Sequence, residues 1–240
     1  MKLQENSPKP LQIKEKDFIE IEFTGKIKDG EVFDSTIKDE LEKLHVEHDH
    51  PIEAKPFIFC LGQGMFLKAL DDFLIEKETG KDYEIELESE QAFGKRNPSL
   101  VQKIPINVFK EQKVNPAPGV VFNFDGRVGK ILTVSGGRVM VDFNHSLAGK
   151  TLIYKIKILR KVTDLNEKIK ALNEFFFRKE FKFEVKDKKL IIEVEESLIK
   201  LVELFKDKFK DALGLELEVK EIEDKKIEGK KEEKNIKKSQ

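Results

Sequence analysis

Residues 151–159 read Thr-Leu-Ile-Tyr-Lys-Ile-Lys-Ile-Leu, and residues 18–23 read Phe-Ile-Glu-Ile-Glu-Phe. In both runs apolar and polar side chains alternate, which is typical of strands with one buried face. Between these runs the residue pattern changes, and in residues 151–159 the alternation of the first run returns. We therefore expect both runs to lie in one sheet, with an inserted domain formed by part of the chain between them.

The segment after the first run predicts an antiparallel sheet with one central helix. Asp29-Gly30 separates two strand-like runs, which is a strong signal for a hairpin. Residues 56–62 indicate a buried strand that ends at glycine, and residues 83–87 alternate again. Residues 65–76 carry apolar side chains at helical spacing, and a short amphipathic helix is expected within residues 36–55. This combination indicates the α+β class.

Residues 96–143 differ from the preceding segment in their proline content and turn signals. Prolines punctuate this segment, and Asp125-Gly126 and Ser135-Gly136-Gly137 separate alternating runs, which predicts a small all-β domain built from hairpins. A segment of this size can barely bury a core alone, so attachment at both ends would support it. We therefore expect a discontinuous domain, residues 15–95 and 144–162, that holds an inserted domain, residues 96–143.

Further segments complete the predicted organisation. Residues 163–222 show the order α-β-β-α-β, with Asp164 as an N-cap and Gly214 ending the second helix. This order predicts a compact C-terminal α+β domain. Residues 223–240 are mostly Lys, Glu and small polar residues, which predicts a disordered charged tail, and residues 1–14 form a separate N-terminal segment.

Composition excludes several classes of protein. The 240-residue chain has 45 Lys and Arg against 46 Asp and Glu, a net charge of −1, so it lacks the basic surplus that nucleic-acid binding needs. No apolar run reaches the ~18 residues of a membrane span, and the N-terminus does not read as a secretory signal. The single Cys60 excludes a disulfide framework and a CxxC metal site. We expect a cytoplasmic protein with neither a membrane partner nor a structural metal.

Several short stretches occur in one order and together carry a resemblance. They are Phe23-Thr24-Gly25, Gly30-x-Val32-Phe33-Asp34-Ser35, Pro56-Phe57-x-Phe59-x-Leu61-Gly62, Ala92-Phe93-Gly94 and Asn144-His145-x-Leu147-Ala148-Gly149-Lys150-Thr151-Leu152. Over roughly residues 15–162 the chain resembles the FKBP family of peptidyl-prolyl cis-trans isomerases. The last stretch and the β insertion are similar to the SlyD-like branch, in which an insert-in-flap domain replaces the loop over the active site. The helical insertion after Ser35 and the C-terminal domain resemble those of long archaeal members.

The resemblance implies an FKBP-like antiparallel sheet wrapped on a central helix, with a site that isomerises X-Pro bonds. It implies catalytic roles for Asp34, Phe93 and Tyr154, with Asp34 orienting or polarising the twisting amide and not acting as a base. The residues that it implies for substrate binding are Phe23, Phe57, Phe66, Leu67, Leu70 and His145. In this reading the Leu67 N–H donates to a substrate carbonyl, and Leu70 is the floor of the prolyl pocket.

This sequence departs from the family pattern at several of these positions. Phe23 and Phe93 stand where many relatives have Tyr, and Leu70 stands where eukaryotic members often have Trp. Tyr154 replaces a usual Phe. The missing hydroxyls put macrolide affinity in doubt more than isomerisation, because hydrogen bonds to a ligand are lost while the apolar walls survive.

The residue types agree with such a reaction. The sequence shows no Ser-His-Asp pattern, phosphate loop or HExxH motif, and prolyl isomerisation needs none of these because no covalent bond is made or broken. The barrier is amide resonance, about 18–20 kcal/mol. A twisted amide is less polar than a planar one, so an apolar site stabilises it. We expect no cofactor, and we expect clients that are unfolded or nascent polypeptides bound partly by the inserted domain, which would add chaperone activity.

Alternative interpretations stay open. The protein could be a holdase-type chaperone with a weak or vestigial isomerase site. His45, His48 and His50 could hold Ni²⁺ or Zn²⁺ for a metallochaperone, although their acidic neighbours favour a solvated turn. The run Phe175-Phe176-Phe177 cannot bury three rings on one helix face, so we also expect a homodimer through the C-terminal domain.

Overall fold

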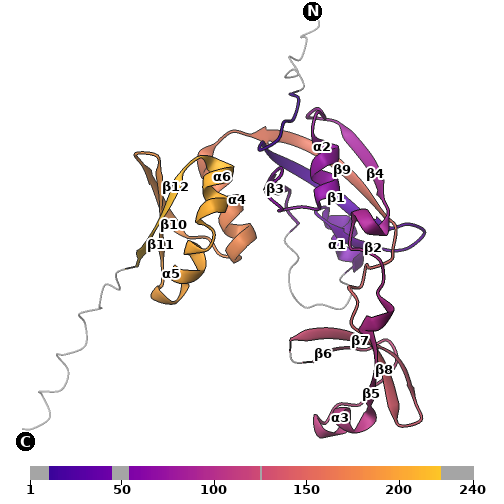
Figure 1. Ribbon diagram of the computed structural model, residues 1–240. Coiled ribbons are helices and arrows are strands. Elements are labelled where there is room, and N and C mark those ends of the chain that lie inside the picture. Colours follow the sequence, from indigo (N-terminus) through magenta and orange to yellow (C-terminus); the bar gives the residue numbers. More distant parts are fainter. Residues whose placement is uncertain (1–10, 45–53, 125, 223–240) are drawn as a thin grey trace, which may run out of the picture. The chain divides into compact units, whose positions relative to one another are not determined.

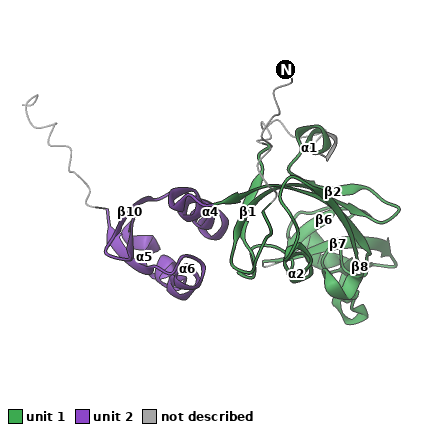
Figure 2. Ribbon diagram, turned by 90° about the horizontal axis from the view of Figure 1, so that it is seen from above, with its two compact units in different colours: residues 1–162 green, residues 163–240 purple. Residues whose placement is uncertain are grey.

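The computed structural model describes residues 11–44, 54–124 and 126–222. The chain separates into two compact units, residues 1–162 and residues 163–240 (Figure 2). The expected charged tail and most of the N-terminal segment lie outside the described residues. His45, His48 and His50 lie outside them as well, so the structure does not bear on the metal interpretation.

The main sheet of the first unit contains the two runs that suggested the fold. Its strands are β1 (Phe18–Ile27), β2 (Val32–Ser35), β3 (Phe57–Cys60), β4 (Asp82–Leu87) and β9 (Leu152–Val162). They follow the order β2-β1-β9-β4, and β3 also pairs with β1. Strands β1 and β9 pair antiparallel from Phe18 opposite Val162 to Ile27 opposite Leu152 (Figure 1). The prediction that the later run returns to the sheet of the first is confirmed.

Helix α2 (Lys68–Leu74) lies against one face of this sheet (Figures 1 and 2). Leu70 and Leu74 are fully buried there, as the helical spacing predicts. The helix is shorter than the expected residues 65–76: residues 61–64 form a turn in which Gly62 and Gly64 adopt φ values of 78° and 71°, and Glu76, with a φ of 66°, lies beyond its end. The residues before Lys68 therefore belong to a loop that leads into the helix.

The other elements of this part agree with their sequence signals. Asp29 has a φ of 58°, and the Gly30 N–H donates to the Ile27 carbonyl over 2.9 Å, which closes the expected hairpin between β1 and β2. Helix α1 (Lys38–Leu44) is the expected short helix after β2. The 3-10 helices η1 (Ser89–Gln91) and η2 (Pro98–Leu100) follow β4.

A second sheet forms between η2 and β9. Its strands are β5 (Val101–Pro105), β6 (Val121–Phe124), β7 (Arg127–Ser135) and β8 (Arg138–Asp142), in the order β5-β8-β7-β6. The all-β prediction for this segment is wrong, because helix α3 (Ile106–Glu111) follows β5. Phe109 of α3 is buried with Ile131, Val139 and Val141. A small sheet needs an apolar cover to bury one face, and the helix supplies part of it.

The second unit packs helices with a three-stranded sheet. Its elements are α4 (Leu165–Phe177), β10 (Lys182–Lys186), β11 (Lys189–Val194), α5 (Glu196–Glu203), α6 (Lys206–Leu213) and β12 (Glu216–Glu221). The Asp164 side chain caps α4 by accepting the Glu167 N–H over 2.9 Å, and Gly214 ends α6 with a φ of 70°, both as expected. The single second helix of the sequence prediction is wrong. The chain turns at Leu204 and Phe205, which separates α5 from α6. There the ring centroids of Phe205 and Phe176 lie 4.8 Å apart.

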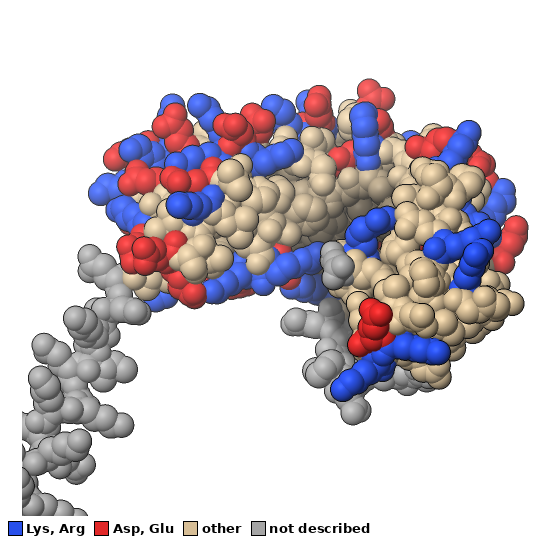
Figure 3. All heavy atoms as spheres, turned by 60° about the horizontal axis from the view of Figure 1, so that its bottom comes forward, with Lys and Arg blue, Asp and Glu red and all other residues tan. Residues whose placement is uncertain are grey.

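The described residues confirm the α+β class, with several antiparallel strand pairs and short helices. Charges of both signs are interspersed over much of the face shown in Figure 3, in keeping with the balanced composition. Ion pairs such as Lys68–Asp72, at 2.8 Å, are exposed, and such pairs contribute little individually. Among the described residues, no helix is long and apolar enough to cross a bilayer.

Candidate functional site

Four of the predicted site residues form one group of rings, which we call the aromatic cluster: Phe23, Phe57, Phe66 and Tyr154. The Phe66 ring is central to it, with centroids 5.2 Å from Phe23, 5.9 Å from Phe57 and 5.8 Å from Tyr154. Phe23 and Tyr154 are 6.2 Å apart. The rings come from β1, β3, β9 and the loop before α2. The cluster therefore places apolar surface where four separate segments of the chain meet.

Strand register explains why these rings meet. Gly25 of β1 lies opposite Tyr154 of β9, so Phe23, two residues earlier on the same face, is a diagonal neighbour of Tyr154. Gly25 has no side chain, and a Cβ there would lie 2.8 Å from the Phe33 ring and 3.0 Å from the Tyr154 ring. The glycine of the Phe-Thr-Gly stretch therefore leaves the space that Phe33 and Tyr154 occupy.

Asp34 places a carboxylate close to this cluster. It lies on β2 opposite Gly25, and its side chain keeps an exposed surface. Desolvation by its surroundings nevertheless raises the pKa of the Asp34 carboxyl above its ordinary value, against the opposing effect of a hydrogen bond from the Ser35 backbone. Burial and then the negative charge of Asp34 raise the pKa of Tyr154. The charge of Asp34 thus acts on Tyr154 at one side of the cluster.

The start of α2 contributes the next two predicted residues. Leu67 is the N-cap of α2, and its carbonyl accepts the N–H of Leu70 over 2.8 Å and that of Asp71 over 3.0 Å. Within the described ranges, the Leu67 N–H itself has no hydrogen-bond partner. Leu70 has no exposed surface. Leu67 can therefore offer a backbone donor, while Leu70 can only underlie the site.

Phe93 and His145 form a separate pair. Their rings stack with centroids 4.3 Å apart and planes inclined by 3°. The His145 Nδ1 accepts the Leu147 N–H over 3.2 Å, which fixes the orientation of the ring. No ring contact joins this pair to the aromatic cluster in the part of the chain that the structure describes. By their ring contacts, the described aromatic residues of the predicted site therefore form two groups.

Comparisons with known proteins give the chain its family. The FKBP26 IF domain model matches residues 102–147. The FKBP-type 16 kDa peptidyl-prolyl cis-trans isomerase of Escherichia coli (strain K12) is 30% identical over 144 residues, which are 58% of this chain and 87% of that protein. The chain belongs to the FKBP-type peptidyl-prolyl cis-trans isomerases.

Other relatives of this FKBP-type protein agree. The short-type peptidyl-prolyl cis-trans isomerase of Methanocaldococcus jannaschii is 29% identical over 146 residues, 61% of this chain and 92% of that protein. The FKBP-type peptidyl-prolyl cis-trans isomerase SlyD of Aeromonas hydrophila is 29% identical over 142 residues, 58% of this chain and 60% of that protein. The family resemblance of the ordered short stretches is thereby confirmed.

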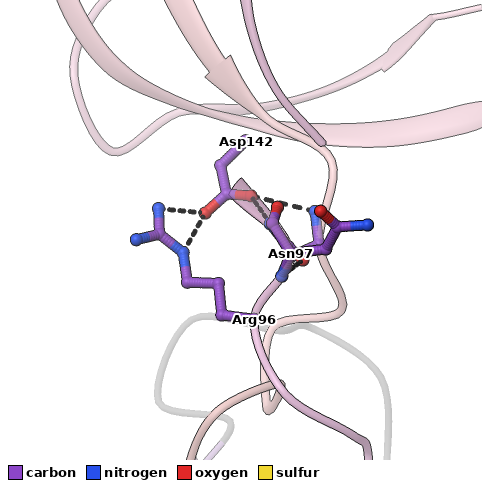
Figure 4. A network of polar contacts seen from close by, with 4 residues as sticks. Arg96, Asn97 and Asp142 are labelled. Atoms are coloured by element: carbon purple, nitrogen blue, oxygen red, sulfur yellow. Dashed lines mark hydrogen bonds and ion pairs between the residues drawn. The ribbon is translucent and has the colours of Figure 1, made fainter. Parts of the chain in front are cut away.

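In this FKBP-type chain, a polar network joins the segment before the second sheet to the segment after it. We call Arg96, Asn97, Asp142 and Asn144 the hinge network (Figure 4). The Asn144 Oδ1 accepts the Asn97 N–H over 2.8 Å, and its Nδ2 donates to the Asn97 carbonyl over 3.0 Å. Arg96 donates to Asp142 Oδ2 from Nε over 3.0 Å and from Nη2 over 2.6 Å. The segment before the second sheet and the segment after it are therefore joined directly by hydrogen bonds.

Sequence reasoning missed two residues near the FKBP-type site. Phe33 contacts Tyr154 with centroids 5.8 Å apart, and its signal was its place beside Asp34 in the quoted stretch. Asp71 is 4% exposed, and its signal was a charge on the apolar face of the α2 sequence, between Leu67 and Leu74 at helical spacing. Among the described residues, no three His, Cys, Asp or Glu side chains gather as a metal site would require.

Proposed function

We propose that this protein catalyses the cis-trans isomerisation of X-Pro bonds in unfolded polypeptides. The observation that supports it best is the aromatic cluster with the Asp34 carboxylate beside it. The family of the chain points to the same activity. In this proposal Phe23, Phe57 and Phe66 contact the proline ring.

The physical basis of the reaction is the polarity difference between planar and twisted amides. The planar X-Pro bond is held by resonance, with a barrier of about 18–20 kcal/mol, and its dipole favours water. The twisted bond is less polar, so apolar walls stabilise it relative to the planar ground state. No proton or electron has to be transferred, and no cofactor is required.

Polar groups near the cluster orient the substrate in this proposal. The Leu67 N–H, which has no partner in the described part of the chain, donates to a substrate carbonyl and so fixes the chain while the imide bond rotates. Asp34 orients or polarises the rotating amide through its charge and does not act as a base. The stacked pair of Phe93 and His145 contacts the residues beside proline.

An isomerisation assay with a proline-containing tetrapeptide tests this function and site together. The Asp34→Ala and Phe93→Ala variants should each lower kcat/KM about tenfold, corresponding to ~1.4 kcal/mol of lost transition-state stabilisation. Asp82→Ala is a matched control, because Asp82 is an exposed aspartate at the start of β4. Absence of turnover by the wild type would reject the proposed reaction, and full activity of both variants would reject the proposed site.

The second sheet supports an additional chaperone activity. We propose that the chain has the insert-in-flap arrangement expected from its sequence and that β6 binds extended polypeptide. In the order β5-β8-β7-β6, strand β6 is an edge of the described sheet. Val121 on β6 and Val128 on β7 are 56% and 61% exposed. An edge strand beside exposed valines offers backbone hydrogen bonds and apolar contacts to an incoming strand.

Charge substitutions at this edge test the chaperone activity. We expect Val121→Lys combined with Val128→Lys to weaken suppression of client aggregation and refolding of a proline-limited protein. Turnover of the short peptide should stay unchanged, because neither valine belongs to the isomerase site. Val185→Lys in the second unit, at a valine 37% exposed on β10, is the matched control. Equal chaperone activity in all these proteins would contradict the proposal.

A further inference from the structure

Helix α2 carries a buried carboxylate that the proposed reaction does not use. Asp71 is only 4% exposed. Its Oδ2 accepts the Gly62 N–H over 3.0 Å, and its Oδ1 has no partner among the described residues. A carboxylate held in this way is costly, because burial removes water without supplying a full set of donors. Gly62 is thus the main polar contact that Asp71 makes.

Asp71 connects both ends of the loop that leads to the site. Its side chain holds Gly62 at the start of the loop, and its backbone N–H donates to the Leu67 carbonyl over 3.0 Å at the end. Between these points the chain passes through Gly64 with a φ of 71° and then reaches Phe66 of the aromatic cluster. The Asp71 carboxylate is therefore connected to Phe66 and Leu67 through a short segment.

The surroundings of Asp71 make its charge sensitive to pH. Desolvation raises the pKa of its carboxyl to about 6, against the lowering effect of the Gly62 hydrogen bond. On its own helix, Asp72 raises and Lys68 lowers this pKa. From the segment before β1, Glu15 comes close to Gly62, since a Cβ on that glycine would lie 3.8 Å from Glu15 Oε1.

We propose that Asp71 is a positioning residue of the isomerase site, which holds Gly62 and thereby fixes the segment that presents Phe66 and Leu67 to substrate. The inference rests on the proposed isomerase function. The ionised carboxylate accepts the Gly62 N–H in a charge-assisted hydrogen bond, which is stronger than the bond made by a neutral acid. Acidification therefore loosens the loop and weakens substrate binding.

The pH profile of kcat/KM for the proline tetrapeptide tests this role. For the wild type we expect about a fivefold decrease as the pH falls through 6, mostly as a rise in KM, which is the size expected when a charge-assisted bond becomes neutral. Asp71→Asn should show the low value throughout and lack this step. Asp72→Asn is the matched control, because Asp72 is the adjacent aspartate and pairs with Lys68 at the surface. It should keep the step.

A second measurement separates this inference from the proposed function. The amide resonance of Gly62 in the full chain should titrate with a midpoint near pH 6 in the wild type and in Asp72→Asn, whether or not the peptide is turned over. A Gly62 resonance that does not respond to pH overturns the proposal, including the case where Asp71→Asn fails to fold. A kinetic step that survives in Asp71→Asn also overturns it, since that result assigns the step to another group such as Asp34.

Discussion

At the scale of single residues, Tyr154 is the unusual member of the aromatic cluster. Its ring is 3% exposed and packs against Phe23, Phe33 and Phe66. Within the described residues its hydroxyl makes no hydrogen bond, and burial, followed by the charge of Asp34, raises its pKa. A polar group is thus available in a site whose other rings are phenylalanines.

The Tyr154→Phe variant shows whether substrate uses this hydroxyl. We expect kcat/KM for the peptide to fall about two- to tenfold, the effect of losing one hydrogen bond. The melting temperature should hardly change, because the ring contacts are retained. Tyr83→Phe is a control that removes the other tyrosine hydroxyl, which accepts the Glu78 N–H over 2.9 Å. Unchanged kinetics in Tyr154→Phe would show that the hydroxyl does not contact substrate.

Asp71 also gives a stability prediction at this scale. Its pKa is raised from 3.8 to about 6 in the folded protein, so the native state binds more protons than the unfolded state between these values. The carboxylate therefore destabilises the fold increasingly as the pH rises from about 4 to 6, by at most ~3 kcal/mol above that window. Denaturant titrations should show the wild type gaining stability relative to Asp71→Asn as the pH falls from 7 to 4. A difference that is constant with pH would contradict the raised pKa.

At the scale of elements, the hinge network joins the chain segments on either side of the second sheet. Asn144 takes part in most hydrogen bonds of the hinge network, including one from its Nδ2 to Asp142 Oδ1 over 2.6 Å. Hydrogen bonds from Asn144 and Arg96 outweigh desolvation and lower the pKa of Asp142, so this carboxylate stays ionised at neutral pH. The network therefore holds both segments by charge-assisted as well as neutral hydrogen bonds.

Asn144→Ala should separate the two proposed activities. Without the side-chain amide of Asn144, the segments before and after the second sheet lose the hydrogen bonds between Asn97 and Asn144, so the second sheet is held less firmly. We expect peptide turnover to stay within about twofold of wild type, while refolding of a proline-limited protein slows several-fold because effective concentration of the client falls. Asn107→Ala, at an exposed position on α3, is the control. Equal losses in both assays would show that Asn144 serves the isomerase site itself.

At the scale of the whole molecule, the second unit exposes apolar side chains. Leu204, in the turn between α5 and α6, is 80% exposed, and Leu201 on α5 is 44% exposed. Isolated exposed leucines are ordinary, but two at helical spacing form a small apolar patch. We expect this patch to support the homodimer predicted from the Phe-rich C-terminal domain. Light scattering should then show a dimer that Leu204→Glu converts to a monomer; a monomeric wild type at high concentration would exclude it.

The sequence predicted local structure well where a periodic pattern and a boundary residue agreed. The alternation in β1 and β9, the Asp29-Gly30 hairpin, the Asp164 cap and the Gly214 helix end are all found. It failed where tertiary contacts changed the local outcome. Helix α3 was missed, although Phe109 fills the core beside the second sheet, and the second helix of the last unit is interrupted where Phe205 meets Phe176.

The amino-acid sequence by itself determined the α+β class, the return of β9 to the first sheet and the family, because periodicity and short ordered stretches are local properties of the chain. Only the tertiary structure decided which rings meet. Strand register placed Tyr154 beside Phe23, and the Phe33 ring also contacts Tyr154, whereas Phe93 stacks on His145 instead. It also decided that Asp71 is buried, because burial depends on what packs against a helix face and not on the residues of that helix.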